Sequence, residues 1–225
     1  MSAPELNVLS LVGPVGNSAL HAAGVAEVVK DKPEKPIVLC ALGDGMTQQG
    51  EVHEAIGHAV RDTLPVLFLI EDNAFAISTD TRRKTFYSNP NGEADQYYGI
   101  PIRRVDGRDP VASHEVFEET VDAMRSDREP RIIVFQVDRL QNHTNADDQR
   151  VYRTPDEIDA INQTGDPIKN LARYLTEHGV EQSELDDLRE QIQSDLAAIA
   201  REAQRSPDPK PFGGAKKDLP PALTE

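Results

Sequence analysis

Two short polar segments contain the residue types that hold a metal ion and a phosphorylated ligand. They are Gly43-Asp44-Gly45 and, after 26 intervening residues, Asp72-Asn73. A carboxylate and an amide oxygen are among the ligands that Mg²⁺ prefers, together with phosphate oxygens. Glycines let the backbone approach a diphosphate closely, and N–H groups at the start of a following helix favour its negative charge. The two segments therefore predict a site for magnesium and a diphosphate.

Both segments follow predicted buried strands. Residues 37–42 and 65–70 are continuous apolar runs of strand length, typical of strands buried on both faces in a parallel sheet. Between them, apolar residues recur with the period of one helix face: Val52, Ala55, Ile56, Ala59 and Val60. The order strand, helix, strand predicts a βαβ unit, and ligands of such sheets bind at the carboxyl ends of the strands.

A second, looser set of elements follows. Residues 100–105 and 131–137 are predicted strands, with a predicted helix over 111–126 between them. The polar stretches 84–98 and 140–154 are expected to be irregular, and loops of that length in an α/β domain are more often functional than not. Both stretches are therefore candidates for a functional role.

The ends of the chain differ in character from its centre. Small residues from 11 to 29 predict a helix packed closely on neighbouring backbone, and apolar spacing predicts short and long helices around 168–175 and 185–199. The Pro- and Lys-containing residues after 206 resemble an extended arm. We therefore predict an α/β domain over 1–165, a helical C-terminal extension over 166–205 and a tail over 206–225.

Composition excludes several classes of protein. The formal net charge of −15 argues against a broad nucleic-acid or anionic-membrane surface. Cys40 is the single cysteine, so no internal disulfide is possible, and a reducing, cytoplasmic setting is the simplest interpretation. The first twenty residues lack a signal-peptide pattern and no 18-residue apolar run occurs, so we expect neither secretion nor membrane spanning.

Longer motifs around these segments carry a family resemblance, which extends from about Leu11 through Ala203. The motifs are GDGMTQQGEVHEA, EDNAFAIST, YGIPIRRVDGRD and DRLQNHTNADDQRVYRTPDEI. Together they resemble the alpha subunit of the thiamine diphosphate-dependent 2-oxo acid dehydrogenase E1 component, of the pyruvate or branched-chain type. The resemblance implies a three-layer α/β thiamine diphosphate-binding fold with a mainly parallel sheet.

The resemblance also assigns roles to individual residues. It implies Mg²⁺ ligands in the side chains of Asp44 and Asn73 and the backbone carbonyl of Phe75. Gly45 and Met46 amides would face the diphosphate, Val12 would lie in the segment that contacts the aminopyrimidine, and Arg139 and His143 would reach the diphosphate or the mouth of the site. His143 would also serve catalysis, in reductive acyl transfer to a lipoyl group. Thr144 stands where animal members carry a regulatory phosphorylated serine.

Two departures from the family pattern bear on function. Asp72 replaces the first Asn of the usual Asn-Asn pair, which adds a carboxylate beside the expected diphosphate. The region that precedes the matching stretch in family alpha subunits has no counterpart here. We therefore expect a beta-type E1 subunit, a lipoyl-bearing E2 and a small-molecule 2-oxo acid as partners, with a separate N-terminal alpha fragment as a further candidate.

Alternatives to these interpretations remain open at the level of sequence. The chain could be a non-catalytic assembly or regulatory fragment, or belong to another thiamine enzyme class. Arg139 could simply pair with Asp138 or another acid, and His143 could be an ordinary loop residue. His53 and His58 are interpreted as structural or interfacial, because they lie five positions apart and do not share a helix face.

Overall fold

The structure is a computed structural model that describes residues 3–9 and 13–207. The chain divides into two compact units, Met1–Tyr174 and Leu175–Glu225. The first unit contains the sheet and all of the predicted site residues that the structure describes. The predicted contact residue Val12 lies outside the described residues. The division into 1–165, 166–205 and 206–225 remains a prediction.

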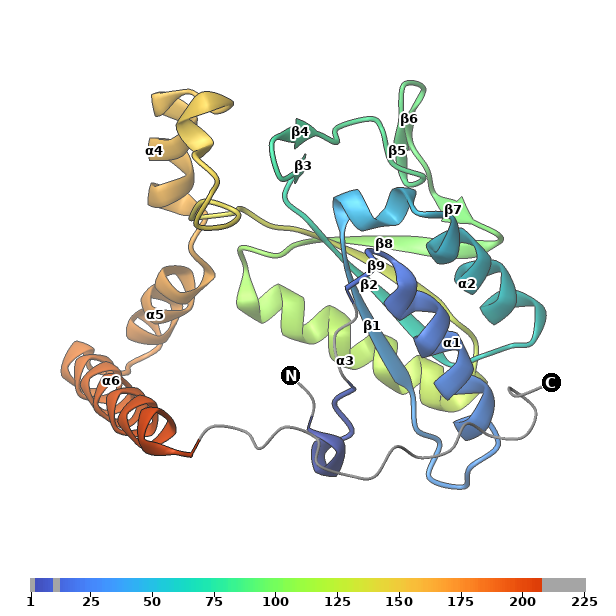
Figure 1. The fold of residues 1–225 in the computed structure, drawn as a ribbon, viewed down its shortest axis with the longest axis horizontal. Coiled ribbons are helices and arrows are strands. Elements are labelled where there is room, and N and C mark those ends of the chain that lie inside the picture. Colours follow the sequence, from blue (N-terminus) through green and yellow to red (C-terminus); the bar gives the residue numbers. More distant parts are fainter. Residues whose placement is uncertain (1–2, 10–12, 208–225) are drawn as a thin grey trace. The chain divides into compact units, whose positions relative to one another are not determined.

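A five-stranded sheet forms the centre of the first unit (Figure 1). Its order is β1 (Val38–Gly43), β2 (Val66–Asp72), β9 (Arg131–Gln136), β8 (Ile100–Asp106) and β7 (Gln96–Tyr97). The first four strands are parallel, and only the short β7 pairs antiparallel, with β8. The predicted strands and the mainly parallel sheet are therefore confirmed, with boundaries one or two residues from those expected.

Helices cover both faces of the sheet, which gives the predicted three layers (Figure 1). On one face lie α1 (Asn17–Val29) and α2 (Gly50–Arg61); on the other lies α3 (Pro110–Asp127). The α1 helix buries only alanines, which lets its backbone approach α2 and the sheet closely: Ala19, Ala22, Ala23 and Ala26. The apolar face predicted for α2 is buried through Val52, Ala55, Ile56 and Ala59.

Each face of the sheet has its own core because side chains alternate along the strands. In β2, Phe68 and Ile70 point to the core beneath α1 and α2, and Leu67 points to the smaller core beneath α3. The lone cysteine, Cys40, belongs to the larger core and is 4% exposed, as expected for a small hydrophobe. The sheet is thus held rigidly from both sides, and its carboxyl ends are fixed in space.

Three local predictions were inaccurate. The first helix begins at Asn17 rather than Leu11, because Gly16 adopts φ +89° and a Cβ there would lie 2.7 Å from Gln49. The stretch 84–98 was expected to be irregular, yet it contains the short pair β5 (Ser88–Asn89) and β6 (Gly92–Glu93) and the strand β7. Another short pair, β3 (Phe75–Ala76) and β4 (Thr79–Asp80), directly follows β2.

A helix that was not predicted, α4 (Pro155–Thr164), follows the second long loop. Thr154 caps it: the Thr154 hydroxyl accepts from the Glu157 N–H, and the Glu157 carboxylate accepts from the Thr154 N–H. This reciprocal pair, with proline at the first helical position, is a helix-start signal that the sequence contains.

The helices predicted near the C-terminus are present as α5 (Pro167–Glu177) and α6 (Gln182–Arg205). The apolar stripe of α6 is exposed in the described chain, at Leu188, Ile192, Leu196 and Ile199. Among the described residues, no helix is both long and apolar enough to cross a membrane. Three 3₁₀ helices complete the described structure, at Pro4–Leu6, Asp44–Gln48 and Gln149–Val151.

Candidate metal and diphosphate site

The two polar segments meet at the carboxyl ends of β1 and β2, as predicted. Gly43, the last residue of β1, is in register with Glu71 of β2. Asp44 directly follows Gly43, and Asp72 directly follows Glu71 as the last residue of β2. Since neighbouring strands lie about 4.8 Å apart, the backbones of Asp44 and Asp72 are neighbours. The Asp44 side chain is 2% exposed at the start of the 3₁₀ helix that leaves the sheet. The two carboxylates therefore follow neighbouring strands at the carboxyl end of the sheet, near enough for the charge of Asp72 to act on Asp44.

Burial and charge both act on the Asp44 carboxyl. Its pKa is raised above the usual range, first because burial disfavours the charged form and also because the Asp72 carboxylate repels it. The hydrogen bond from the Thr81 hydroxyl acts in the opposite direction. In the described part of the chain, neither Asp44 nor Asp72 forms an ion pair with a Lys or Arg side chain. A buried carboxylate without a cation is costly, and a divalent metal ion would remove that cost.

Asn73 offers an oxygen to the same place. Its amide oxygen is buried and has no hydrogen-bond partner among the described residues. The turn that presents it is fixed by the Ala74 N–H, which donates to Asp72 Oδ1 at 2.8 Å, and by Ala74 at φ +63°. Buried polar atoms nearly always have a partner, so this oxygen is available to a ligand that the described residues do not supply.

The β3–β4 hairpin connects the separate parts of the site. Thr81, just after the hairpin, donates its hydroxyl hydrogen to Asp44 Oδ2. A Cβ on Gly45 would lie 2.5 Å from the Cβ of Ala76, so only glycine permits this approach. On the other side of the hairpin, the Ile77 carbonyl accepts a hydrogen bond from Arg139 at 2.9 Å. The hairpin thereby joins both strand ends to the distant loop.

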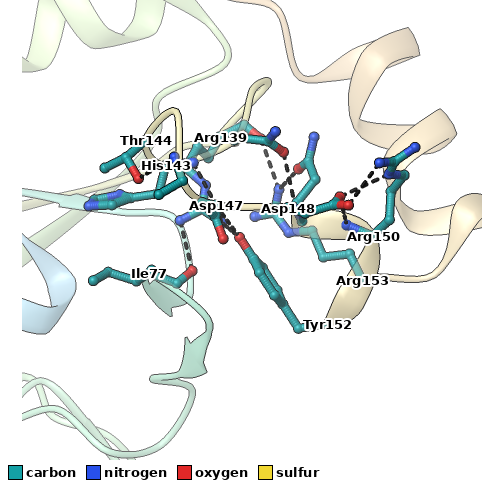
Figure 2. A network of polar contacts seen from close by, with 12 residues as sticks. Ile77, Arg139, His143, Thr144, Asp147, Asp148, Arg150, Tyr152 and Arg153 are labelled. Atoms are coloured by element: carbon teal, nitrogen blue, oxygen red, sulfur yellow. Dashed lines mark hydrogen bonds and ion pairs between the residues drawn. The ribbon is translucent and has the colours of Figure 1, made fainter.

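Asp147 organises that loop (Figure 2). Its Oδ2 atom accepts from the Tyr152 hydroxyl at 2.6 Å and from the His143 N–H at 2.7 Å, and it lies 3.9 Å from the Arg139 guanidinium. The hydrogen bonds from Tyr152 and His143 hold the pKa of the Asp147 carboxyl below its usual range. One carboxylate oxygen therefore fixes three members of the loop.

Arg139 is a structural centre of the loop. Its guanidinium donates to the Ile77 carbonyl and to the Tyr152 hydroxyl, while Arg153 donates to the Arg139 carbonyl at 2.9 Å. Sequence suggested that Arg139 could pair with Asp138 or another acid: Asp138 instead lies 3.6 Å from Arg108, and the acid near Arg139 is Asp147, at 3.9 Å. The Arg139 Nε atom is buried and has no partner among the described residues.

His143 takes part through its backbone only. Its side chain is exposed, and Figure 2 shows the ring pointing away from Asp147 and Tyr152. No hydrogen bond from the ring to another described residue is formed. The neighbouring Thr144 is exposed as well. The loop is thus rigid at its base, with the imidazole at its surface.

Phe75 joins the two halves of the site through its ring. The guanidinium of Arg153 lies 4.8 Å from the ring centre and that of Arg82 lies 5.1 Å from it, and the Tyr152 ring is 5.6 Å away. Such cation–aromatic contacts contribute about 0.5–2 kcal/mol each. The Phe75 backbone, the predicted third metal ligand, is thereby held next to Asn73.

A cleft of about 620 Å³ opens beside Asn73. Phe75, Tyr87, Arg104 and Arg153 are among its lining residues. Tyr87 is 1% exposed, and its hydroxyl has no hydrogen-bond partner of standard geometry in the described chain. Burial raises the pKa of this hydroxyl, and the nearby charge of Asp72 raises it further. Arg104 fixes the Tyr87 backbone by donating to its carbonyl at 2.7 Å.

The structure brings together most residues singled out from sequence, and adds two. Asp44, Gly45, Asn73 and Phe75 gather around the strand ends, and Arg139 reaches them through the hairpin. Sequence reasoning missed Thr81 and Tyr87. No local sequence pattern marks Thr81, since its role depends on a hydrogen bond to Asp44, which lies 37 positions earlier in the chain. Tyr87 is a large aromatic residue in a polar stretch, which is a weak sign of burial.

The fold and the site define a class of protein. It is a three-layer α/β protein with a mainly parallel sheet, in which a buried carboxylate and an unpartnered amide oxygen follow the ends of two neighbouring strands and the Arg139 loop is hydrogen-bonded to the hairpin after them. The particular family follows from comparison: residues 1–212 match the model of the dehydrogenase E1 component. The chain belongs to the dehydrogenase E1 component family, and the relatives described below are alpha subunits.

Relatives of both predicted types are found. The chain is 36% identical over 174 residues to the 3-methyl-2-oxobutanoate dehydrogenase subunit alpha of Mycobacterium tuberculosis, covering 77% of this chain and 47% of the relative. It is 31% identical over 185 residues to the pyruvate dehydrogenase E1 component subunit alpha of Mycoplasma genitalium, covering 82% and 51%. Identity to the human mitochondrial 2-oxoisovalerate dehydrogenase subunit alpha is 26%, covering 97% and 50%. The chain spans about half the length of these relatives.

Proposed function

We propose that this chain is the alpha-type portion of a 2-oxo acid dehydrogenase E1 component that binds magnesium and thiamine diphosphate in the cytoplasm. The observation that carries the proposal is the buried Asp44 carboxylate just after β1 together with the unpartnered, buried Asn73 oxygen just after the neighbouring strand β2. An amide oxygen and a carboxylate without a cation form an incomplete set of hard oxygen ligands, and Mg²⁺ with a diphosphate would complete it.

The residues present fit the cofactor. Asp44 and Asn73 would supply side-chain ligands and Phe75 its carbonyl oxygen. Gly45 packs so closely against Ala76 that a Cβ would not fit, and glycine carries no side chain that would keep a diphosphate from its backbone. The backbone amides of Gly45 and Met46 would then donate to the diphosphate.

When bound, thiamine diphosphate supplies the nucleophilic carbon and the electron sink needed to decarboxylate a 2-oxo acid. The chain's own residues hold and orient the group. Arg139 is anchored by Ile77 and Tyr152, so its positive charge stays near the strand ends. The exposed His143 ring, on a loop fixed at Asp147, would exchange a proton with a partner's acyl-accepting group.

Further chains complete the proposed activity. We assign activation of the cofactor's aminopyrimidine to a beta-type E1 subunit, and acceptance of the acyl group to a lipoyl-bearing E2. A separate N-terminal alpha fragment is a further proposed partner. The exposed stripe of α6 offers apolar area for subunit contact.

Calorimetry tests the cofactor assignment. Thiamine diphosphate is titrated into the full chain, with and without its beta-type partner, in the presence of Mg²⁺ or EDTA. We expect magnesium-dependent binding that Asp44→Asn and Asn73→Ala each weaken by more than about tenfold. Asn91→Ala, an exposed loop change, serves as the matched control. Absence of binding even with the partner would overturn the proposal.

An activity measurement separates the remaining candidates. The assembled chains are assayed with pyruvate and with branched-chain 2-oxo acids, with a lipoyl domain as acceptor. Turnover that depends on the lipoyl domain supports the E1 assignment. Cofactor binding without turnover would favour the non-catalytic fragment, and the extra carboxylate of Asp72 is the specific feature in its favour. Turnover with another acceptor would favour another thiamine enzyme class.

A further inference from the structure

Asp72 is a charged member of the site to which the proposed function gives no role in binding the cofactor. It is the last residue of β2, and its backbone carbonyl is fixed by the Val137 N–H at 2.9 Å. One carboxylate oxygen, Oδ1, accepts from the Ala74 N–H, so the side chain is held in one orientation. The position thus presents a second carboxylate to Asp44 on the neighbouring strand.

The Asp44 and Asp72 carboxylates lack a counter-charge among the described side chains. Asp44 and Asp72 are like charges on adjacent strand ends, and no described Lys or Arg side chain forms an ion pair with either of them. The Thr81 hydroxyl satisfies one oxygen of Asp44 but does not neutralise it. Two carboxylates this close are stable together when a cation or a proton is shared between them.

One buried, unpartnered acceptor points to a cation, and a buried hydroxyl lies near enough to position Asp72. The Asn73 amide oxygen is buried without a hydrogen-bond partner, and it can only accept or coordinate. The Tyr87 hydroxyl is buried without a partner of standard geometry, and Tyr87 lines the same cleft as Asp72 and Asn73. It is near enough to Asp72 for the carboxylate charge to raise its pKa. As a donor, it can hold the Asp72 carboxylate in place.

We propose that Asp72 is a third side-chain ligand of the divalent cation and lets this chain bind the cation without a diphosphate. The inference rests on the proposed magnesium site and deepens it. Tyr87 is a positioning residue that donates to Asp72. A site with Asp44 alone carries one negative charge and depends on phosphate oxygens, whereas Asp44 with Asp72 balances a divalent cation by itself.

The same charge acts against the diphosphate. A diphosphate binds less favourably to a cation whose charge two carboxylates already balance, because the Asp72 carboxylate repels the diphosphate. Removing the Asp72 charge should therefore weaken binding of the cation alone while leaving binding of the cation with thiamine diphosphate unchanged or stronger. A residue that only supported the fold would weaken both.

Manganese binding to the full chain, without added thiamine diphosphate, tests the proposal. Free Mn²⁺ is counted by electron paramagnetic resonance, with competition by Mg²⁺. We expect one site, weakened about 10–100-fold by Asp72→Asn and about tenfold by Tyr87→Phe, which removes only the hydroxyl. Asp95→Asn, an exposed charge change of identical chemistry, is the matched control and should have no effect.

A spectroscopic readout checks coordination directly. The chain is labelled with ¹³C at its aspartate carboxyls, and nuclear magnetic resonance spectra are recorded as Mn²⁺ is added. Mn²⁺ should first broaden the carboxyl signals of Asp44 and Asp72, which are identified because Asp44→Asn and Asp72→Asn each remove one of them. Broadening of the Asp44 signal alone would overturn the proposal. So would Mn²⁺ binding that Asp72→Asn leaves unchanged, or a parent chain that binds no Mn²⁺ until thiamine diphosphate is added.

The outcomes separate this inference from the proposed function. Mn²⁺ binding that depends on Asp72, with no thiamine diphosphate binding in any assembly, would support the inference and overturn the function. Magnesium-dependent binding of thiamine diphosphate, in a chain that does not bind Mn²⁺ in the absence of thiamine diphosphate, would support the function and overturn the inference.

Discussion

The hydroxyl of Thr81 donates a hydrogen bond to the buried carboxylate of Asp44, and so joins residues 37 positions apart. The donor follows the β3–β4 hairpin and the acceptor follows β1. Because the hairpin also contacts Gly45 and Arg139, this one bond fixes the hairpin to the carboxyl ends of the strands. The site is therefore positioned by the sheet on one side and the hairpin on the other.

Loss of that hydroxyl should destabilise the metal-free chain. In Thr81→Val, Asp44 remains buried but loses its donor, which costs about 1–3 kcal/mol. Thr81→Ser keeps the donor and should restore most of the loss. The free energy of unfolding from urea titrations at neutral pH measures both. Thr79→Val, an exposed threonine on the same hairpin, is the control, and a loss of equal size there would contradict the assignment.

Close packing between Gly45 and Ala76 predicts a compensating pair. Gly45→Ala would place its Cβ 2.5 Å from that of Ala76, so the hairpin must shift, at a cost of about 1–3 kcal/mol. Ala76→Gly alone should cost at most about 1 kcal/mol. If the clash is the cause, the double variant should be more stable than Gly45→Ala alone. Additive losses in the urea-derived free energy of unfolding would show that another effect is responsible.

Much of the sheet could be predicted because its determinants are local. The apolar runs that became β1 and β2 and the helical spacing of α2 are each contained within a dozen residues. The strand-end positions of Asp44 and Asn73 follow from these elements, since parallel strands place their carboxyl ends at one edge. That logic carried the prediction of a metal site.

The hairpin and the two loops could not be predicted in the same way. β3 and β4 are two residues each, too short for any periodic pattern, and their positions depend on distant contacts such as Arg139 to Ile77. Tyr87 is placed by the Arg104 guanidinium, which donates to the Tyr87 and Ala94 carbonyls. The helix α4, in contrast, was predictable, since Thr154, Pro155 and Glu157 form a start signal.

Burial of Cys40 predicts an unreactive thiol. Burial raises its pKa to about 11, against about 8.5 for a free cysteine. At pH 8 the native thiolate fraction is then about a thousandth, so labelling by a disulfide reagent should be more than about a hundredfold slower in the native than in the urea-unfolded chain. Cys40→Ser should give no signal in either state. Immediate stoichiometric labelling of the native chain would contradict the buried position.

Loop order around Asp147 should depend on pH in the acid range. The folded pKa of Asp147 is depressed by the Tyr152 hydroxyl and the His143 N–H, so its contribution to loop stability is present above the unfolded pKa near 4. That contribution is lost as pH falls through the lower, folded pKa.

Tyr152→Phe removes the largest cause of the lowered Asp147 pKa and should move the loss of loop order to higher pH. Carboxyl ¹³C titration of Asp147, with amide exchange across residues 139–153, measures both. Asp148 provides the internal control. Hydrogen bonds from Arg150 lower its pKa to about 2, and Tyr152→Phe should leave that pKa unchanged. An unchanged Asp147 titration in Tyr152→Phe would show that the hydroxyl does not stabilise the charged form.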